Sequence, residues 1–292
     1  MLQYHAFVLA GYTVSFLPKR LGYVFSRLIA DVVYLFCPGV RAGIAVNQRR
    51  VLGPKAGNRK LRGAVRGVLR NTAYNYFDLI KLPRLKRLSI ERSITVNGWE
   101  HLEAALSKGK GVVFVTAHLG SYDTAAQIFA LKSLRTTVLV EPIKPPRLLN
   151  HVIRLRQSHG VSFICSQPGT INTLFKCLQR GEMVLFASDR DIDKNGLQID
   201  FFGKDTTLPT VAVRIAMKTG AALVPIFSRR KANGKIEINL EPPIETNGRG
   251  DAAQLADKVK EVARIMEHYI GKNPEQWVVL NPLWPEQTAA LN

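Results

Sequence analysis

The chain of 292 residues contains only three cysteines, Cys37, Cys165 and Cys177, and none of them stands in a CxxC pair. An odd number of widely spaced cysteines does not build a disulfide scaffold, and it suits a reducing cytosol. The chain also lacks an HExxH segment and any close Cys/His cluster, which are the common zinc-site patterns. The segment from Lys108 to Gly111 lacks the GxxxxGK[ST] frame, so a phosphate loop is excluded.

Long apolar runs are missing as well. Residues 1–17 are mostly apolar, Pro18-Lys19-Arg20 interrupts them, and residues 21–37 are apolar again around Arg27 and Asp31. Neither piece reaches the roughly 20 apolar residues of a spanning helix. A secretory signal would need a basic start and a small-residue cleavage site, and residues 1–37 offer neither.

Acidic side chains are scarce relative to basic ones. The chain carries 41 Lys and Arg against 22 Asp and Glu, a formal net charge of +19, and residues 1–100 account for +13 of it. An excess this concentrated implies an anionic partner, either nucleic acid or membrane headgroups. Two short apolar segments flanked by cations favour a helical region that lies on the membrane, whereas a buried helical hairpin with a solvated basic face is the alternative.

The remaining chain, 46% apolar and without low-complexity tracts or repeats, is typical of a packed core. Residues 42–90 follow a largely helical pattern. Short β-branched or apolar runs then alternate with helical patterns, with strands expected at 111–116, 136–140, 161–165, 183–187, 197–202, 222–227 and 235–240. Helices are expected at 123–131, 146–158, 170–179, 210–218 and 251–271, before a tail with two tryptophans. This order predicts an α/β fold with a layered, substantially parallel or mixed sheet flanked by helices.

The first strong strand leads directly into a candidate site. His118 falls at its end, Gly120 and Ser121 permit a tight turn, and Asp123 begins the next helix. Five positions along one helix would turn the two side chains about 140° apart, but across a strand–turn–helix junction they can converge. A carboxylate on one imidazole nitrogen would leave the other as a base for an acceptor hydroxyl. On spacing alone, a structural histidine remains the alternative.

The segment 109–123 resembles the HX4D block of glycerolipid-type acyltransferases, and within them the lipid A acyltransferase family, including its phosphatidylinositol mannoside branch. Further matching segments follow in order along nearly the whole chain. They are Glu141-Pro142, Arg154 and Arg156 before Gly160, Ser188-Asp189-Arg190-Asp191, Phe201-Phe202-Gly203, Leu208-Pro209, Thr219-Gly220-Ala221, Pro225, and Pro274-Glu275-Gln276-Trp277 with Trp284. The Asp-Arg-Asp and Phe-Phe-Gly segments favour the mannoside branch.

The resemblance implies an acyltransferase with His118 as general base and Asp123 as its partner. It implies acyl-CoA or acyl carrier protein as donor and a hydroxyl of a membrane glycolipid, such as phosphatidylinositol mannoside, as acceptor. It implies neither a metal nor a cofactor. Lipid A precursor or a lysophospholipid is the alternative acceptor. A basic nucleic-acid-binding protein or a non-catalytic membrane scaffold is the alternative of another class, although the sequence carries no recognised nucleic-acid module.

Six charged residues are candidates for substrate binding. Glu141 and the triplet Asp189, Arg190 and Asp191 follow predicted strands, where sites form in open α/β sheets. Arg154 and Arg156 lie near a helix end, where planar guanidinium groups can bind a phosphate. For each of these residues a salt bridge or a solvated surface position is the alternative. We divide the chain into a membrane-docking region, 1–95, and a catalytic domain, 96–292, and expect peripheral or monotopic attachment to the cytoplasmic face of the membrane.

Overall fold

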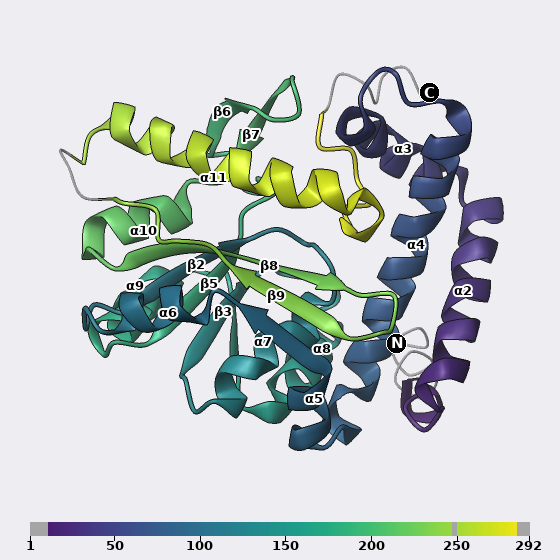
Figure 1. Cartoon of the computed structure of the whole chain (residues 1–292), viewed down its shortest axis with the longest axis horizontal. Helices are drawn as coiled ribbons and strands as arrows, with labels where there is room; N and C mark the ends of the chain where they lie inside the picture. The colour runs from purple at the N-terminus through teal and green to yellow at the C-terminus, as the bar shows by residue number, and fades with distance from the viewer. Residues whose placement is uncertain (1–10, 247–249, 285–292) are drawn as a thin grey trace.

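The structure is a computed structural model of the whole chain, and it describes residues 11–246 and 250–284. A layered α/β unit adjoins a group of helices formed by residues 19–81 (Figure 1). The α/β fold predicted from the alternating pattern is confirmed. Expectations for residues 1–10 and for the end of the tail, 285–286, lie outside the described residues.

Three helices form the group at the end of the molecule. They are α2 (Lys19–Phe36), α3 (Pro38–Leu52) and α4 (Asn58–Lys81). They share a small apolar core that includes Ala30, Ile44 and Val68. Gly22 permits the close approach of α2 to α4, because a Cβ atom there would lie 2.0 Å from the Phe77 ring. The short elements η1 (Leu82–Arg84) and α5 (Arg87–Ser93) lead from α4 to the sheet.

Seven strands of the described residues form the main sheet, in the order β1-β9-β8-β2-β5-β3-β4. The strands are β1 (Ile94–Asn97), β2 (Val112–Thr116), β3 (Thr136–Val140), β4 (Ser162–Cys165), β5 (Met183–Ala187), β8 (Ala222–Arg230) and β9 (Ile236–Leu240). Pairings from β8 through β4 are parallel, whereas β9 runs antiparallel to β8 and β1 runs parallel to β9. The sheet is therefore mixed.

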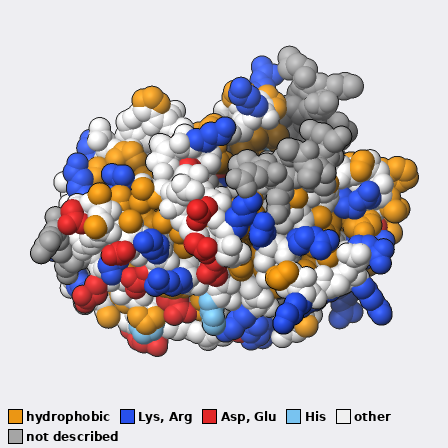
Figure 2. Space-filling view, turned by 90° about the horizontal axis from the view of Figure 1, so that it is seen from above, with side chains coloured by type: hydrophobic (Ala, Val, Ile, Leu, Met, Phe, Trp, Pro, Cys, Tyr) orange, Lys and Arg blue, Asp and Glu red, His pale blue; other side chains and the backbone are white. Residues whose placement is uncertain are grey.

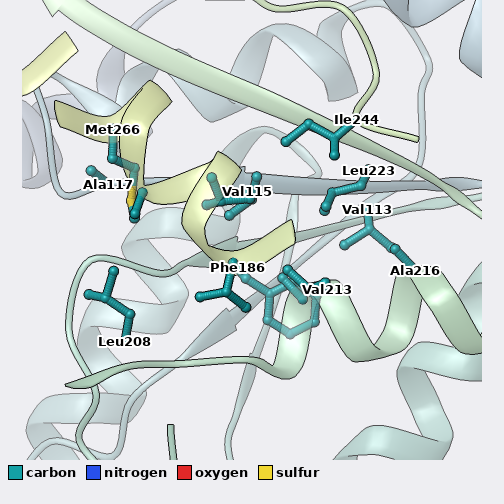
Figure 3. Packing of buried hydrophobic residues seen from close by; sticks show 14 of the residues in the cluster. Val113, Val115, Ala117, Phe186, Leu208, Val213, Ala216, Leu223, Ile244 and Met266 are labelled. Carbon is teal, nitrogen blue, oxygen red and sulfur yellow. The ribbon is translucent and has the colours of Figure 1, made fainter. Parts of the chain in front are cut away.

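Helices cover both faces of this sheet. The connecting helices are α6 (Trp99–Leu106), α7 (Tyr122–Leu131), α8 (Pro146–Arg156) with η2 (Gln157–His159), α9 (Thr170–Gln179), α10 (Val211–Thr219) and α11 (Ala252–Lys272), followed by η3 (Pro274–Gln276). Alternate residues of β2 point to opposite faces. Val113 and Val115 pack with α10 and α11 (Figure 3), and Phe114 packs with α6 and α7. Such a period of two is what a strand buried on both faces requires.

Two short strands were not anticipated. β1 has four residues and pairs at the sheet edge with β9. The strand expected at 197–202 ends at Asp200, and β6 (Leu197–Asp200) turns back into β7 (Asp205–Leu208) as an antiparallel hairpin outside the main sheet. The turn runs through the Phe-Phe-Gly segment, where Phe202 and Gly203 adopt positive φ.

The described residues contain no single helix that is long and apolar enough to cross a bilayer. The pair α2 and α3 reaches that length and composition only together, and it is bent by 97° at the break between them. The outward side of α2 is apolar and exposed. Leu21, Val24, Phe25, Leu28, Ile29, Val32, Leu35 and Phe36 are each between 49% and 76% exposed.

Candidate active site

The centre of the site lies where β2 and β5 end side by side. The two strands are parallel and in register, with Thr116 opposite Ala187. The backbone N–H of Ser188 donates to the Thr116 carbonyl at 2.8 Å, which extends the ladder beyond the strands. His118 and Asp189 each lie two residues beyond this last pair, so they are brought together at the carboxyl edge of the sheet.

His118 and Asp189 form a close pair. The imidazole Nδ1 lies 2.8 Å from Oδ1 of Asp189, and the His118 backbone N–H donates to Oδ2 at 3.0 Å. The indole Nε1 of Trp277, from the segment after η3, donates to the same Oδ2 at 2.8 Å. Burial alone would raise the pKa of Asp189, but His118, Arg190 and the Trp277 hydrogen bond outweigh it and hold that pKa below its ordinary value. Asp189 is thus an anion without solvent contact that orients the imidazole.

The exposed side of the imidazole is the one that can react. The His118 side chain is 22% exposed, whereas Asp189 is fully buried. An ionised carboxylate accepts a hydrogen bond from Nδ1, which leaves Nε2 as the basic nitrogen of the neutral ring. Tyr122 packs edge-on against the ring with centroids 5.6 Å apart. Burial, and secondarily Asp123, raises the pKa of the Tyr122 hydroxyl, so this hydroxyl stays protonated at neutral pH.

The expected pairing of Asp123 with the imidazole is wrong. Asp123 lies in the first turn of α7 and forms an ion pair with Arg156, at 2.8 Å from Nε and with a hydrogen bond of 3.3 Å from Nη2. The side chains of both residues are largely buried, at 10% and 14% exposed. Gln127 donates to the backbone oxygens of Asp123 and Arg156 and ties α7 to the end of α8. The reason for the difference is the strand order, because β5 lies directly beside β2 and places Asp189 on Nδ1.

The turn between His118 and α7 is fixed from several elements. Gly120 has φ of 67°, and a Cβ atom there would lie 2.3 Å from the carbonyl oxygen of Ser228. The Gly120 N–H donates to the Gln276 carbonyl at 3.0 Å, and the Asn75 amide donates to the Gly120 carbonyl at 2.8 Å. The Ser228 hydroxyl donates to the Leu119 carbonyl at 2.9 Å. Glycine is required here because both backbone conformation and close contact exclude a side chain.

A buried polar cluster connects this turn to the N-terminal helices. Arg230, at the end of β8, donates to Asp78 at 2.7 Å and to Asn75 at 2.8 Å, both on α4. The Tyr23 hydroxyl of α2 donates to Asp78 at 3.0 Å, and the Ser121 hydroxyl lies 3.5 Å from the same carboxylate. Asn75 thus bridges Arg230 to Gly120. Apart from Ser121, these residues lie outside the motif, and no sequence pattern identified them.

The other candidate residues are distributed around the same edge. Arg190 pairs with Glu141 across the ends of β5 and β3, with Nη2 at 2.8 Å and 3.1 Å from the two carboxylate oxygens, and the side chains are 25% and 38% exposed. Asp191 accepts from the Gly196 N–H at 2.9 Å and closes its own loop. Arg154 is exposed on α8. Arg156 forms the ion pair with Asp123 described above. Among the described residues, no cluster of three His, Cys, Asp or Glu side chains could hold a metal ion.

Comparison with known proteins places this geometry in a family. A family model described as bacterial lipid A biosynthesis acyltransferase matches residues 1–286. The chain belongs to this family. The matched residues include the His118 turn, the Asp189 segment and the Trp277 segment. The His118–Asp189 pair therefore lies within the part of the chain that the acyltransferase family model covers.

Curated relatives of this acyltransferase-family chain fall into two groups. A phosphatidylinositol mannoside acyltransferase from Mycobacterium tuberculosis is 27% identical over 71% of this chain and 66% of its own length. The corresponding protein from Mycolicibacterium smegmatis is 26% identical over 75% and 72%. A lipid A biosynthesis acyltransferase from Haemophilus influenzae is 28% identical over 62% and 56%. The chain is therefore similar to enzymes named for different acceptors.

Among solved structures, one similar to this acyltransferase-family chain is the 1-acyl-sn-glycerophosphate (LPA) acyltransferase PlsC from Thermotoga maritima. The two align with a TM-score of 0.39 and 14% identity, and the alignment covers 89% of this chain and 97% of the other.

Proposed function

We propose that the protein transfers a fatty acyl group from acyl-CoA or acyl carrier protein to a hydroxyl of a membrane glycolipid such as a phosphatidylinositol mannoside. The observation that carries the proposal is the half-buried His118 held by Asp189 at the carboxyl edge of the sheet. The two mycobacterial relatives named above support the mannoside acceptor. Lipid A precursor is the second candidate, because a relative named for lipid A biosynthesis has a similar identity.

His118 acts as the general base in this proposal. Its Nε2 takes the proton from the acceptor hydroxyl as the oxygen attacks the carbonyl carbon of the thioester. The tetrahedral intermediate then collapses, the C–S bond breaks, and the leaving thiolate takes the proton from the imidazolium. Asp189 fixes the Nδ1–H tautomer and stabilises the imidazolium that forms between the two steps. No enzyme nucleophile is required, because the acceptor oxygen forms the new ester directly.

Asp123 acts on this site from a distance in our proposal. Its ion pair with Arg156 joins the first turn of α7 to the end of α8, and Tyr122 lies between this pair and the imidazole. Arg190 and Glu141 form a partly exposed pair at the ends of β5 and β3, at the same carboxyl edge of the sheet as His118. We assign them, together with Asp191 and the exposed Arg154, to the acceptor side of the site.

The exposed apolar side of α2 supports attachment to the cytoplasmic leaflet, where anionic lipids are concentrated. Figure 2 shows hydrophobic and basic side chains together at the end of the molecule that carries α2 and α3. A lipid acceptor and the fatty acyl chain would both be available at such a surface. The proposed attachment is peripheral or monotopic.

The test is an acyl-transfer assay with purified protein and a labelled palmitoyl thioester, supplied in parallel as palmitoyl-CoA and as palmitoyl-acyl carrier protein. Phosphatidylinositol mannoside, a lipid A precursor and a lysophospholipid are offered in separate reactions, and His118→Ala is the control. We expect labelled mannoside with the wild type and at least a hundredfold less with the variant. Preference for one of the other lipids would transfer the proposal to that acceptor. No acylation of any lipid, or equal activity of both proteins, would refute it.

A further inference from the structure

A basic pocket lies apart from the catalytic residues, between the start of α2, α5 and the turn that joins β8 to β9. Its volume is about 460 Å³, and four of its lining residues are the cations Lys19, Lys86, Arg92 and Lys235. None of the lining residues is acidic. Three segments that are far apart in the sequence therefore bring four positive charges to one depression.

Three of these charges have no carboxylate partner within the described part of the chain. Lys86, Arg92 and Lys235 form no ion pair there, whereas Lys19 donates to the Gly234 carbonyl at 3.2 Å, lies over the Tyr23 ring and is attracted by the Asp78 carboxylate. Cations on neighbouring surfaces do have carboxylate partners, since Lys132 pairs with Glu91 at 2.7 Å and Arg70 pairs with Asp31 at 3.1 Å. Like charges gathered around one pocket repel one another, and a bound anion would relieve that repulsion.

The chemistry of the lining favours a phosphate group. Lysine and arginine are the usual phosphate ligands, and the hydroxyl of Ser89 adds a hydrogen-bond donor, whereas the Ser93 hydroxyl donates to the Ile90 carbonyl at 2.7 Å. No aromatic side chain lines the pocket, so a nucleotide base would find no ring to stack on. Leu88 also lines it and is 54% exposed, and α2, which carries the exposed apolar residues, begins at the lining residue Lys19. An anion with an attached apolar chain fits both features.

We propose that this pocket binds the phosphate of an anionic phospholipid headgroup in the bilayer. A bound headgroup would draw the first turn of α2 and the β8–β9 turn together, because Lys19 and Lys235 lie on these two segments. Lys19 precedes Tyr23 by one helical turn, and Tyr23 contacts the Asp78–Arg230 cluster that reaches the His118 turn. The proposal rests on the membrane attachment put forward above and does not depend on which acceptor is acylated.

The experiment compares binding of the full chain to two kinds of vesicle, phosphatidylcholine alone and phosphatidylcholine with 30% phosphatidylglycerol, by co-sedimentation at about 0.1 M salt. The pocket variant is Lys86→Gln with Arg92→Gln, two exposed positions at which folding is not at stake. The control is Lys108→Gln with Lys176→Gln, which removes the same charge from exposed positions at the opposite edge of the sheet. Inorganic phosphate and glycerol 3-phosphate, up to 10 mM, are the soluble competitors.

We expect the pocket variant to lose about tenfold in affinity for the anionic vesicles and little for the neutral ones, whereas the control changes less than about threefold. Millimolar soluble phosphate should not displace the wild type. Equal binding of pocket variant and control would overturn the site while leaving membrane attachment intact. Displacement by soluble phosphate would overturn the lipid as its source. If the wild type binds neither vesicle, the membrane attachment is wrong and this site with it.

Discussion

Oδ1 of Asp189 lies 2.8 Å from Nδ1 of His118, and Oδ2 of the same carboxylate accepts the His118 backbone N–H at 3.0 Å. One carboxylate thus holds both the ring and the backbone of the histidine. The strand that carries Asp189 and the strand that carries His118 are direct neighbours, so the geometry of the pair is set by the ladder of the sheet. The Trp277 indole also donates to this Oδ2, at 2.8 Å, and helps to fix the carboxylate.

Replacing Asp189 by asparagine tests this arrangement. The amide would keep the size of the side chain, but it removes the charge that stabilises the imidazolium and can present an N–H to Nδ1, which favours the wrong tautomer. We expect kcat to fall by about 10²-fold or more, with KM nearly unchanged. Steady-state kinetics of the purified variant provide the measurement. A variant that retained more than half of the wild-type kcat would show that the orientation of the ring does not depend on Asp189.

The same carboxylate predicts how stability depends on pH. The pKa of Asp189 is lower in the folded protein than its ordinary value, because His118, Arg190 and Trp277 outweigh the effect of burial. A lowered pKa stabilises the fold at every pH above the unfolded value, about 3.9, and this contribution is lost as the pH falls toward the folded value. The difference in unfolding free energy between wild type and Asp189→Asn should shrink as the pH falls below about 4, where the carboxylate begins to be protonated. Urea titrations at several pH values below 5 measure it, and a difference that grew as the pH fell through this range would contradict the assigned direction.

The strands and helices of the sheet were predictable where the local pattern is strong. The runs 112–116, 136–140 and 183–187 are rich in β-branched and apolar residues, and they form interior strands of the sheet, which helices cover on both faces. β1 and β7 were missed, because four residues at a sheet edge or in a hairpin carry too little pattern to distinguish them from a loop. The strand order, in which β5 inserts between β2 and β3, is a long-range property that no local signal encodes.

The site was predictable in part for the same reason. His118 was identified because it follows a strong strand within a recognisable motif. Its carboxylate partner was assigned to Asp123, five residues away, whereas the structure uses Asp189, which is 71 residues away. Asp189 was singled out from the sequence, but only as a substrate-binding residue. Asn75, Asp78 and Arg230 meet from two distant elements, and only the packing of α4 against β8 reveals them.

Asp123 and Arg156 form a pair whose energetics can be separated from catalysis. Asp123→Asn leaves a mostly buried guanidinium without its counter-charge, and we expect it to lower the unfolding free energy by about 2–4 kcal/mol. Arg156→Gln should have a similar cost, and the double variant should cost much less than the sum. A double-mutant cycle in urea gives the coupling energy. Additive losses would mean that the ion pair does not stabilise the junction of α7 and α8.

Gly120 offers a comparison of two glycines with the same backbone conformation. Gly120 has φ of 67° and Gly109 has φ of 68°. A Cβ atom at Gly120 would lie 2.3 Å from the Ser228 carbonyl oxygen, whereas a Cβ atom at Gly109 would have no other heavy atom within 4 Å among the neighbours considered. Gly109→Ala should therefore cost only the left-handed strain, about 1–2 kcal/mol. Gly120→Ala should cost at least about 3 kcal/mol, because the contacted atom belongs to the backbone of β8 and cannot move aside. Thermal and urea unfolding of both variants measure the difference, and equal costs would show that the turn can shift.

The exposed apolar side of α2 should contribute to membrane binding in a way that does not depend on charge. Phe25 and Ile29 are 52% and 59% exposed, one turn apart on the helix, and their replacement by serine should remove the contribution to membrane binding that salt does not screen. High salt should release only part of the wild-type protein from vesicles, because its apolar contacts persist, but it should release nearly all of the double variant. Ile171→Ser, at an exposed position of α9 that is 39% exposed, is the control and should behave as the wild type. Flotation of the proteins with vesicles at 0.1 M and 1 M salt gives the bound fractions. Complete release of the wild type at 1 M salt would mean that charge alone holds the protein at the membrane, and the outward side of α2 would then need another explanation.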